Sequence, residues 1–335
     1  VDAMSSEASA RVALVCVMFA VLLTLCQIRL QIMWNSNPKM RKHVIRILLM
    51  VPIYAVQSYI ALLLKDSFVY FDALRECYEA VVIYSFVLLL VGYLGGERHL
   101  VYVLELKPAE YVKHPFPFNY CVGDRVRLGK DYFQFTKIGA LQYVVLKPLT
   151  AIASFILSAT GTLGETDPFR FDRGYLYIVT INSISQALAI YCLLLFYTVM
   201  RTELQPLDFV SKAIVLKTVI FFTYWQSITF RLIALTNIIP LPRSAENYDT
   251  MSRFIDLILC VEMAGFAIAQ WVAWGKGSEF FNPDEKVCEP YGASVWAALN
   301  PKDLWEDAKD AVETGEVKRL LNSRDQRQNV DLVDL

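Results

Sequence analysis

VALVCVMFAVLLTLCQI, residues 12–28, is an apolar stretch without a single charged side chain. Comparable uncharged stretches recur at residues 47–64, 80–94 and 174–200. An α-helix needs about 20 mostly apolar residues to cross a bilayer core that is about 30 Å thick. One such stretch could belong to a buried helix of a soluble protein. A series of them predicts an integral membrane protein.

The composition points the same way and excludes several classes of protein. Of the 335 residues, 56% are hydrophobic and only 19% are charged, whereas soluble domains average about one quarter charged residues. A net charge of −1 argues against a nucleic-acid partner. The seven cysteines form no CxxC pair and show no metal-ligand spacing. Because no GxSxG, HExxH, Walker or GxGxxG pattern occurs either, we expect no catalytic residues, no cofactor and no metal.

The apolar stretches and the polar segments between them predict an all-α bundle of seven membrane-spanning helices within residues 1–275. Asp2 and Glu7 precede the first stretch, which favours a span over a cleaved signal peptide. The polar segment 97–135 is expected to be a loop after Gly95-Gly96, a typical helix stop. The expected spans are 10–33, 44–64, 73–95, 137–158, 174–199, 212–235 and 253–274.

The distribution of basic residues predicts the orientation, because cytosolic segments near membrane spans are enriched in Lys and Arg. An outside N-terminus and a cytosolic C-terminus place eleven basic residues inside and five outside. The inside set is Lys39, Arg41, Lys42, Arg98, Lys107, Lys113, Arg125, Arg127, Lys130, Arg201 and Lys212. The outside set is Arg11, Lys65, Arg170, Arg173 and Arg243.

The cytosolic tail, residues 276–335, contains one further predicted helix over 300–314. Asn300 suits the N-cap and Pro301 the first helical position. Apolar residues then recur at helical spacing opposite a charged face, which is typical of an amphipathic helix. Such a helix lies on the membrane or the bundle, or is an ordinary surface helix. Beyond residue 320 the tail is polar and is expected to be disordered.

Several motifs together resemble one family of seven-span proteins. They are RKHVIRILLMVPIY (41–54), YFDALRECYEAVVIY (70–84), YLGGE (93–97), FQFTKIGALQYVVLKP (133–148), TINSISQALAIYCLLLFY (180–197), ELQP (203–206), FFTYWQ (221–226) and LNPKDLWEDAKDAV (299–312). In this order they resemble the family of the organic solute transporter subunit alpha and transmembrane protein 184, which includes the plant lazarus-type proteins. The last motif is more similar to the transmembrane protein 184 branch.

The resemblance implies seven helices, an outside N-terminus and a cytosolic tail. For the transporter branch it also implies facilitated diffusion of amphipathic organic anions, such as steroid conjugates, together with a small single-span partner. The transporter branch carries a cysteine cluster after the third span, whereas Cys121 is the only cysteine of residues 97–135. This departure puts acylation of that segment, and dependence on the partner, in question.

Ionisable residues inside the expected spans are candidate functional residues, because a charge in a bilayer is costly. Glu79 and Glu262 are the strongest candidates for substrate binding. Arg75 lies one turn before Glu79 and can pair with it, beside Glu76. Two basic residues are further candidates for ion pairing or coupling, and either could pair with Glu262. They are Lys147 and Lys217. Pairing that merely holds the bundle together is the competing interpretation.

Uncharged polar residues complete the predicted site. Asn182 and Gln186 are one turn apart on the fifth span and therefore point the same way. Gln226 adds a polar side chain on the sixth span. Such groups either line a cavity or hydrogen-bond across helices, and the second role is the more common.

The sequence therefore predicts a facilitative carrier of amphipathic organic solutes, such as steroid-like or lipid-like anions, with its site between spans three, five, six and seven. The alternative is a non-transporting membrane receptor, scaffold or trafficking or signalling factor that uses the polar segment 97–135 and the tail as docking surfaces. Expected partners are membrane lipids, the amphipathic solute, and a second copy or a small single-span protein. The expected location is the plasma membrane or an endomembrane, vacuolar or endosomal.

Overall fold

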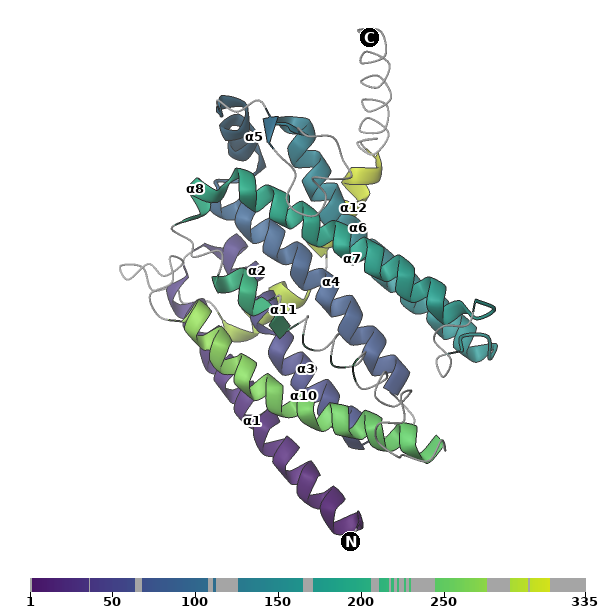
Figure 1. Cartoon of the computed structure of the whole chain (residues 1–335). Helices are drawn as coiled ribbons and strands as arrows, with labels where there is room; N and C mark the ends of the chain where they lie inside the picture. Colours follow the sequence, from purple (N-terminus) through teal and green to yellow (C-terminus); the bar gives the residue numbers. More distant parts are fainter. Residues whose placement is uncertain are drawn as a thin grey trace. The chain divides into compact units, whose positions relative to one another are not determined.

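The computed structural model describes residues 2–35, 37–63, 68–107, 111–112, 126–164, 171–205, 211–216, 218–219, 222, 226, 229, 245–275, 290–300 and 302–313. These residues are predominantly helical, as the sequence predicts (Figure 1). A short antiparallel pair of strands, β1 (Tyr111–Val112) and β2 (Val126–Arg127), is also present. The chain forms two compact units, which we describe separately. The first unit comprises residues 1–82 and 205–298, and the second 83–204 and 299–335.

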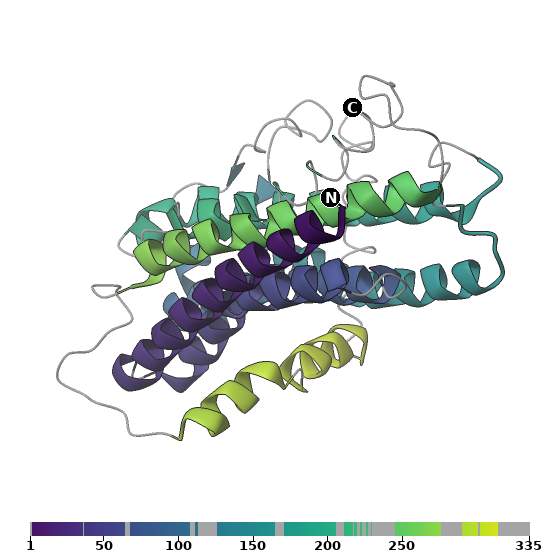
Figure 2. The same cartoon turned by 90° about the horizontal axis from the view of Figure 1, so that it is seen from below.

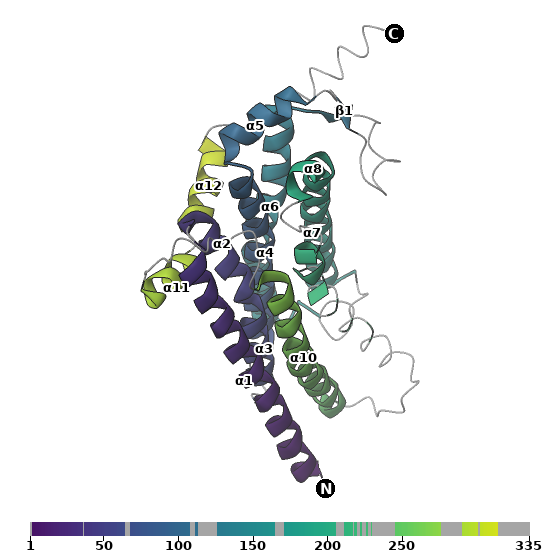
Figure 3. The same ribbon diagram turned by 90° about the vertical axis from the view of Figure 1, so that its left-hand side faces the viewer.

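The first unit is built around three helices that pack side by side, α1, α3 and α10 (Figure 2, Figure 3). On α1, the Gln27 side chain donates a hydrogen bond to the carbonyl of Gln270 at 2.8 Å, and Gln31 donates to the carbonyl of Trp274 at 3.0 Å. Residue numbers rise together in these pairs, so α1 and α10 are parallel. The helices of this unit are α1 (Asp2–Trp34), α2 (Pro38–Leu48), α3 (Met50–Leu63), the first part of α4 (Phe68–Tyr93), α10 (Ala245–Trp274) and α11 (Tyr291–Leu299).

Two contacts fix α3 antiparallel to α10. The Gln270 side chain donates to the carbonyl of Ile47, just before α3, at 3.2 Å. The Cys260 Sγ lies 4.0 Å from the carbonyl of Ala55. This register brings Tyr54 on α3 to within about one turn of Glu262 on α10.

The second unit is organised by a long antiparallel pair, α6 and α7 (Figure 1). Gly139 of α6 packs directly against the Cys192 side chain of α7, which lets the two backbones approach closely. The elements of this unit are the rest of α4, α5 (Glu97–Leu106), β1, β2, α6 (Lys130–Ala159), α7 (Gly174–Val199), α8 (Arg201–Leu204) and α12 (Lys302–Glu313).

Five of the described helical segments are long and apolar enough to cross a membrane, which confirms a multi-span membrane protein. They are 7–34, 38–63, 130–159, 174–199 and 253–274. A sixth is reached if 74–93 and 97–106, bent by 69°, form one span. Most of the predicted span at 212–235 lies outside the described residues. The count of seven and the orientation stay predictions.

The predicted span 44–64 falls within one candidate span, residues 38–63, in which a turn at Leu49 separates α2 from α3. Pro52 has no N–H to donate to the carbonyl of Leu48, where α2 ends. One detail of the sequence interpretation needs correction. The expected loop 97–135 begins with a helix, α5, which buries Leu100 and Leu104 one turn apart. Gly95 and Gly96 do end α4, both with φ near +90° (86° and 90°).

Candidate functional site

Polar side chains concentrate in the interior of the first unit. Tyr54, Gln57 and Ser58 are three and four residues apart on α3 and thus share one face, where each is at most 5% exposed. The Tyr54 hydroxyl, both polar atoms of the Gln57 amide and the Ser58 hydroxyl have no hydrogen-bond partner among the described residues. Buried polar groups are nearly always satisfied, so this face is suited to water or a polar solute.

Three charged residues of α4 lie near Tyr54. The Arg75 guanidinium lies 5.9 Å from the centre of the Tyr54 ring, and Glu76 and Glu79 also act electrostatically on this tyrosine. Glu79 is only 9% exposed. The predicted site residue Glu79 and its neighbours on α4 therefore lie beside the polar face of α3.

Residues of the predicted sixth span run antiparallel to α10. The Lys212 Nζ lies 5.5 Å from the centre of the Trp274 ring, while the Phe222 and Phe266 rings meet edge to face at 6.0 Å. One turn after Phe222 is Gln226, and one turn before Phe266 is Glu262. This register puts these two predicted site residues at the same level of the first unit.

Gln226 and Glu262 share an unusual property. The Oε1 atom of Gln226 and the Oε2 atom of Glu262 are both buried, and neither accepts a hydrogen bond from any described residue. Two buried acceptors without donors are costly in a bilayer. Chemically, the pair is suited to a ligand that donates a hydrogen bond, such as a hydroxyl group, or to water.

The remaining predicted residues belong to the second unit or are not described. The Thr150 hydroxyl of α6 donates to the Oδ1 atom of Asn182 on α7 at 2.8 Å, so Asn182 joins the two helices. Lys147 is 6% exposed, with Nζ 5.7 Å from the centre of the Tyr143 ring. Gln186 also lies on α7, and Lys217 is outside the described residues. Convergence of all five binding candidates stays a prediction.

Another pair joins α6 to α7. The Gln142 amide donates to the carbonyl of Ser185 at 2.9 Å, and the Ser185 hydroxyl donates back to the Gln142 Oε1 at 2.7 Å. These reciprocal bonds satisfy both side chains within the helix pair. They are a structural feature of the second unit.

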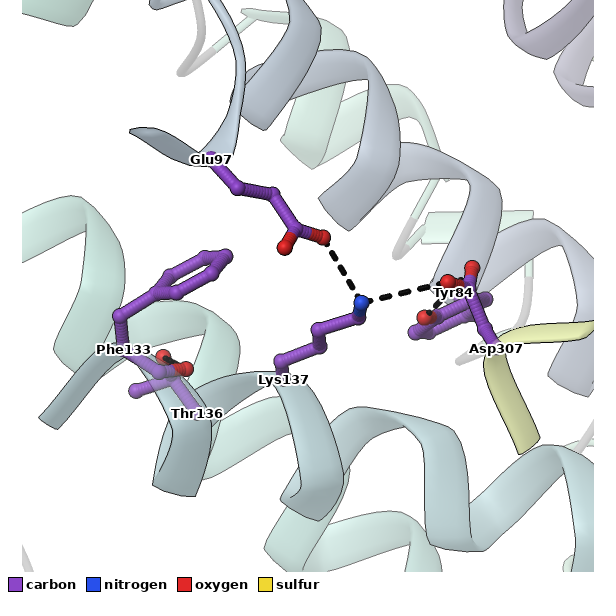
Figure 4. Close-up of polar contacts among 6 residues, drawn as sticks. All are labelled: Tyr84, Glu97, Phe133, Thr136, Lys137 and Asp307. Atoms are coloured by element: carbon purple, nitrogen blue, oxygen red, sulfur yellow. Dashed lines mark hydrogen bonds and ion pairs between the residues drawn. The ribbon is translucent and has the colours of Figure 1, made fainter. Parts of the chain in front are cut away.

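A polar cluster that sequence reasoning missed joins three separate motifs of the second unit (Figure 4). The Lys137 Nζ lies 2.7 Å from the Oε1 atom of Glu97 and 3.2 Å from the Oδ1 atom of Asp307. The Tyr84 hydroxyl donates to the other oxygen of Asp307 at 3.1 Å. The quoted motifs YLGGE, FQFTK and WEDAKD each supply one charged member of this cluster.

A metal centre has no support in the described part of the chain. There, no three His, Cys, Asp or Glu side chains are grouped closely enough to hold an ion.

Comparison with known proteins identifies one family. A family model described as organic solute transporter Ostalpha matches residues 10–279, most of the chain. The matched region begins within α1, includes the helices up to α10 and ends before α11 and α12. No solved structure matches the chain.

Proposed function

We propose that this chain, which belongs to the organic solute transporter Ostalpha family, is a facilitative carrier of amphipathic organic solutes. It is a multi-pass membrane protein of a solute-transporter family. The finer part of the proposal is that the solute is steroid-like or lipid-like and that its binding site lies in the interior of the first unit.

The observation that carries the proposal is the pair of buried oxygens on Gln226 and Glu262. A helix that only needs to span the membrane gains nothing from a buried carboxylate oxygen without a donor, and intramembrane acids usually mark a solute or ion path. The polar face of Tyr54, Gln57 and Ser58 lies at about the same level on α3, within the same unit. These groups supply the few polar contacts that an apolar binding site needs to orient its ligand.

The chemistry of the pair restricts how the solute is oriented. A carboxylate and an amide oxygen repel an anionic group and attract a hydroxyl hydrogen. A steroid conjugate with a free hydroxyl at the end opposite its anionic group carries both kinds of group. We propose that its hydroxyl end meets Gln226 and Glu262, while its anionic end is directed away from them.

Flux of a labelled steroid conjugate tests the proposal. The full chain is reconstituted in liposomes, and initial uptake is compared for the parent protein, Glu262→Gln and Gln226→Met. Glu105→Gln on α5 is the matched control, because Glu105 is exposed and lies outside the proposed site. We expect uptake by the parent and the control, and at least a tenfold loss in the two site variants, about 1.4 kcal/mol.

Two results would contradict the proposal. If folded parent protein gives no uptake above empty liposomes for any steroid conjugate tried, the proposal that this chain alone carries steroid conjugates is wrong. If uptake occurs but Glu262→Gln and Gln226→Met match the control, the chain is a carrier whose site lies elsewhere.

A further inference from the structure

Asp307 joins helix α12 to two other helices of the second unit. Both carboxylate oxygens of Asp307 are engaged, one by the Tyr84 hydroxyl and one by Lys137 of α6 (Figure 4). Leu304, one turn earlier on the same side of α12, is 5% exposed. An ion pair and a buried leucine on one face prevent the helix from rolling about its axis.

The fixed orientation turns Trp305 away from the unit. Trp305 follows Leu304 and so points about 100° around the helix. It is 72% exposed, among the most exposed of the large apolar side chains in the described residues. Lys302 and Lys309 are exposed on the same helix. The helix carries five acidic residues against these two lysines, and Lys302 pairs with Glu306 at 3.6 Å. The outward tryptophan, and not the charge, is therefore the feature typical of a helix in the interface of a bilayer.

The position of Lys137 along α6 determines the depth at which α12 lies relative to the membrane. Lys137 is in the second turn of a helix whose first residues, Lys130 and Asp131, are polar. Exposed apolar side chains begin at Phe135 and continue through Val145 towards the other end. Lys137 therefore lies at the boundary between the polar end of α6 and its apolar surface.

The exposed fractions of the charged side chains agree with a position of the cluster at this boundary. The side chain of Glu97 is 49% exposed, that of Asp307 24% and that of Lys137 17%. A cluster at the centre of a bilayer would not present a half-exposed carboxylate to its surroundings. One side of the ion-pair cluster faces water, as expected at the membrane surface.

We propose that α12 is an interfacial anchor, with Trp305 inserted at the boundary between lipid headgroups and acyl chains and Asp307 holding the helix at that depth. The anchor binds a lipid surface rather than a protein, because the exposed apolar surface of α6 that begins at Phe135 continues into the bilayer core. Tryptophan is the residue enriched at this depth of a membrane. The proposal concerns the tail and is independent of the proposed transport function.

Tryptophan fluorescence tests the anchor in the full chain reconstituted in liposomes. The chain has six tryptophans, and the difference in emission between the parent and Trp305→Phe isolates Trp305. We expect this difference to lose most of its intensity in liposomes of brominated phosphatidylcholine and to change little with aqueous iodide. Trp274→Phe is the control, since Trp274 is 1% exposed and should respond weakly to both quenchers.

The opposite quenching pattern would overturn the proposal. If iodide removes the Trp305 emission and brominated lipid does not, the exposed face of α12 is in water and is free to bind a protein. Asp307→Asn tests the second half of the inference. We expect it to shift the Trp305 emission to longer wavelength and raise its iodide quenching, whereas an unchanged Trp305 would show that Asp307 does not hold the helix.

Discussion

Gln226 and Glu262 lie at the same level of the first unit, and each has a buried side-chain oxygen without a donor among the described residues. Their common level follows from the ring contact one turn away, between Phe222 and Phe266. Two buried acceptors without donors do not stabilise a helix pair. This arrangement is locally unfavourable for folding, and folded proteins retain such arrangements at functional sites.

This relationship predicts that removing the charge of Glu262 stabilises the protein. In Glu262→Gln the carboxylate no longer has to be kept in an apolar environment, and the new amide can donate to the Gln226 Oε1. We expect the midpoint of thermal unfolding in detergent to rise, with a gain on the order of 1 kcal/mol. Glu262→Ala is the comparison, because it removes the charge without supplying a donor.

A stability gain together with a loss of flux would separate the functional role of Glu262 from a structural one. If Glu262→Gln instead lowers the midpoint as much as Glu262→Ala does, the carboxylate has a stabilising partner. The interpretation of this position as a functional conflict would then be wrong.

The close approach of Gly139 and Cys192 predicts a steric effect in the second unit. A Cβ atom at position 139 would overlap the Cys192 Sγ, and Cys192 is fully buried. We expect Gly139→Ala to reduce the free energy of unfolding by about 1–3 kcal/mol, as overpacked cores do. The effect is measured by chemical or thermal unfolding of the purified protein.

The double variant Gly139→Ala, Cys192→Ala is the control for this explanation. Removing the sulfur creates the space that the new methyl group needs, so the double variant should recover most of the lost stability. If the double variant instead loses the sum of the two single losses in free energy of unfolding, the overlap is not the cause.

Most helices of the structure could be predicted from the sequence, because apolar runs of membrane length have few alternatives. The run at 12–28 lies within α1, and the run at 174–200 corresponds almost residue for residue to α7. The glycines at 95 and 96 ended α4 as expected. The break at Leu49 could also have been placed from Pro52, whose missing N–H leaves one specific carbonyl without its helical partner.

The arrangement of the candidate site could not be predicted in the same way. The sequence identified Gln226 and Glu262 as polar residues within apolar spans, but their common level depends on the register between two helices. The cluster of Lys137, Glu97 and Asp307 joins positions 40 and 170 residues apart. The charges of these residues did not indicate which of them would form ion pairs in the folded protein.

The two glutamines that connect α1 to α10 predict unequal effects on stability. Gln31 donates to the carbonyl of Trp274, which is the last residue of α10 and has no helical donor of its own. Gln27 donates to the carbonyl of Gln270, one turn earlier, where the helix itself supplies a donor. We expect Gln31→Met to cost about 1–3 kcal/mol and Gln27→Met clearly less.

Unfolding midpoints of the two methionine variants decide this prediction. Both substitutions keep the length and flexibility of the side chain, and both positions are at most 1% exposed. Gln31→Met also removes the acceptor of the Asn35 amide at 3.3 Å, so Asn35→Ala is measured beside it to subtract that bond. Equal losses would indicate that burial, and not the helix end, determines the contribution of these amides.

The hydrogen bond from Thr150 to Asn182 distinguishes the two roles that the sequence leaves open for Asn182. If the side chain joins α6 to α7, then Thr150→Val and Asn182→Leu should each lower stability by roughly 0.6 kcal/mol, an average for such bonds in membrane proteins. The two losses should not add, because they remove the same interaction. The half-saturating solute concentration for flux should stay unchanged in both variants.

A direct contact between Asn182 and the solute would give a different pattern. Asn182→Leu would then raise the half-saturating concentration, while Thr150→Val, which preserves the Asn182 amide, would leave it as in the parent. We expect the first pattern, because the Oδ1 atom of Asn182 already accepts a bond of 2.8 Å from α6. Measuring unfolding and flux on the same two variants separates a helix-joining residue from a solute-binding one.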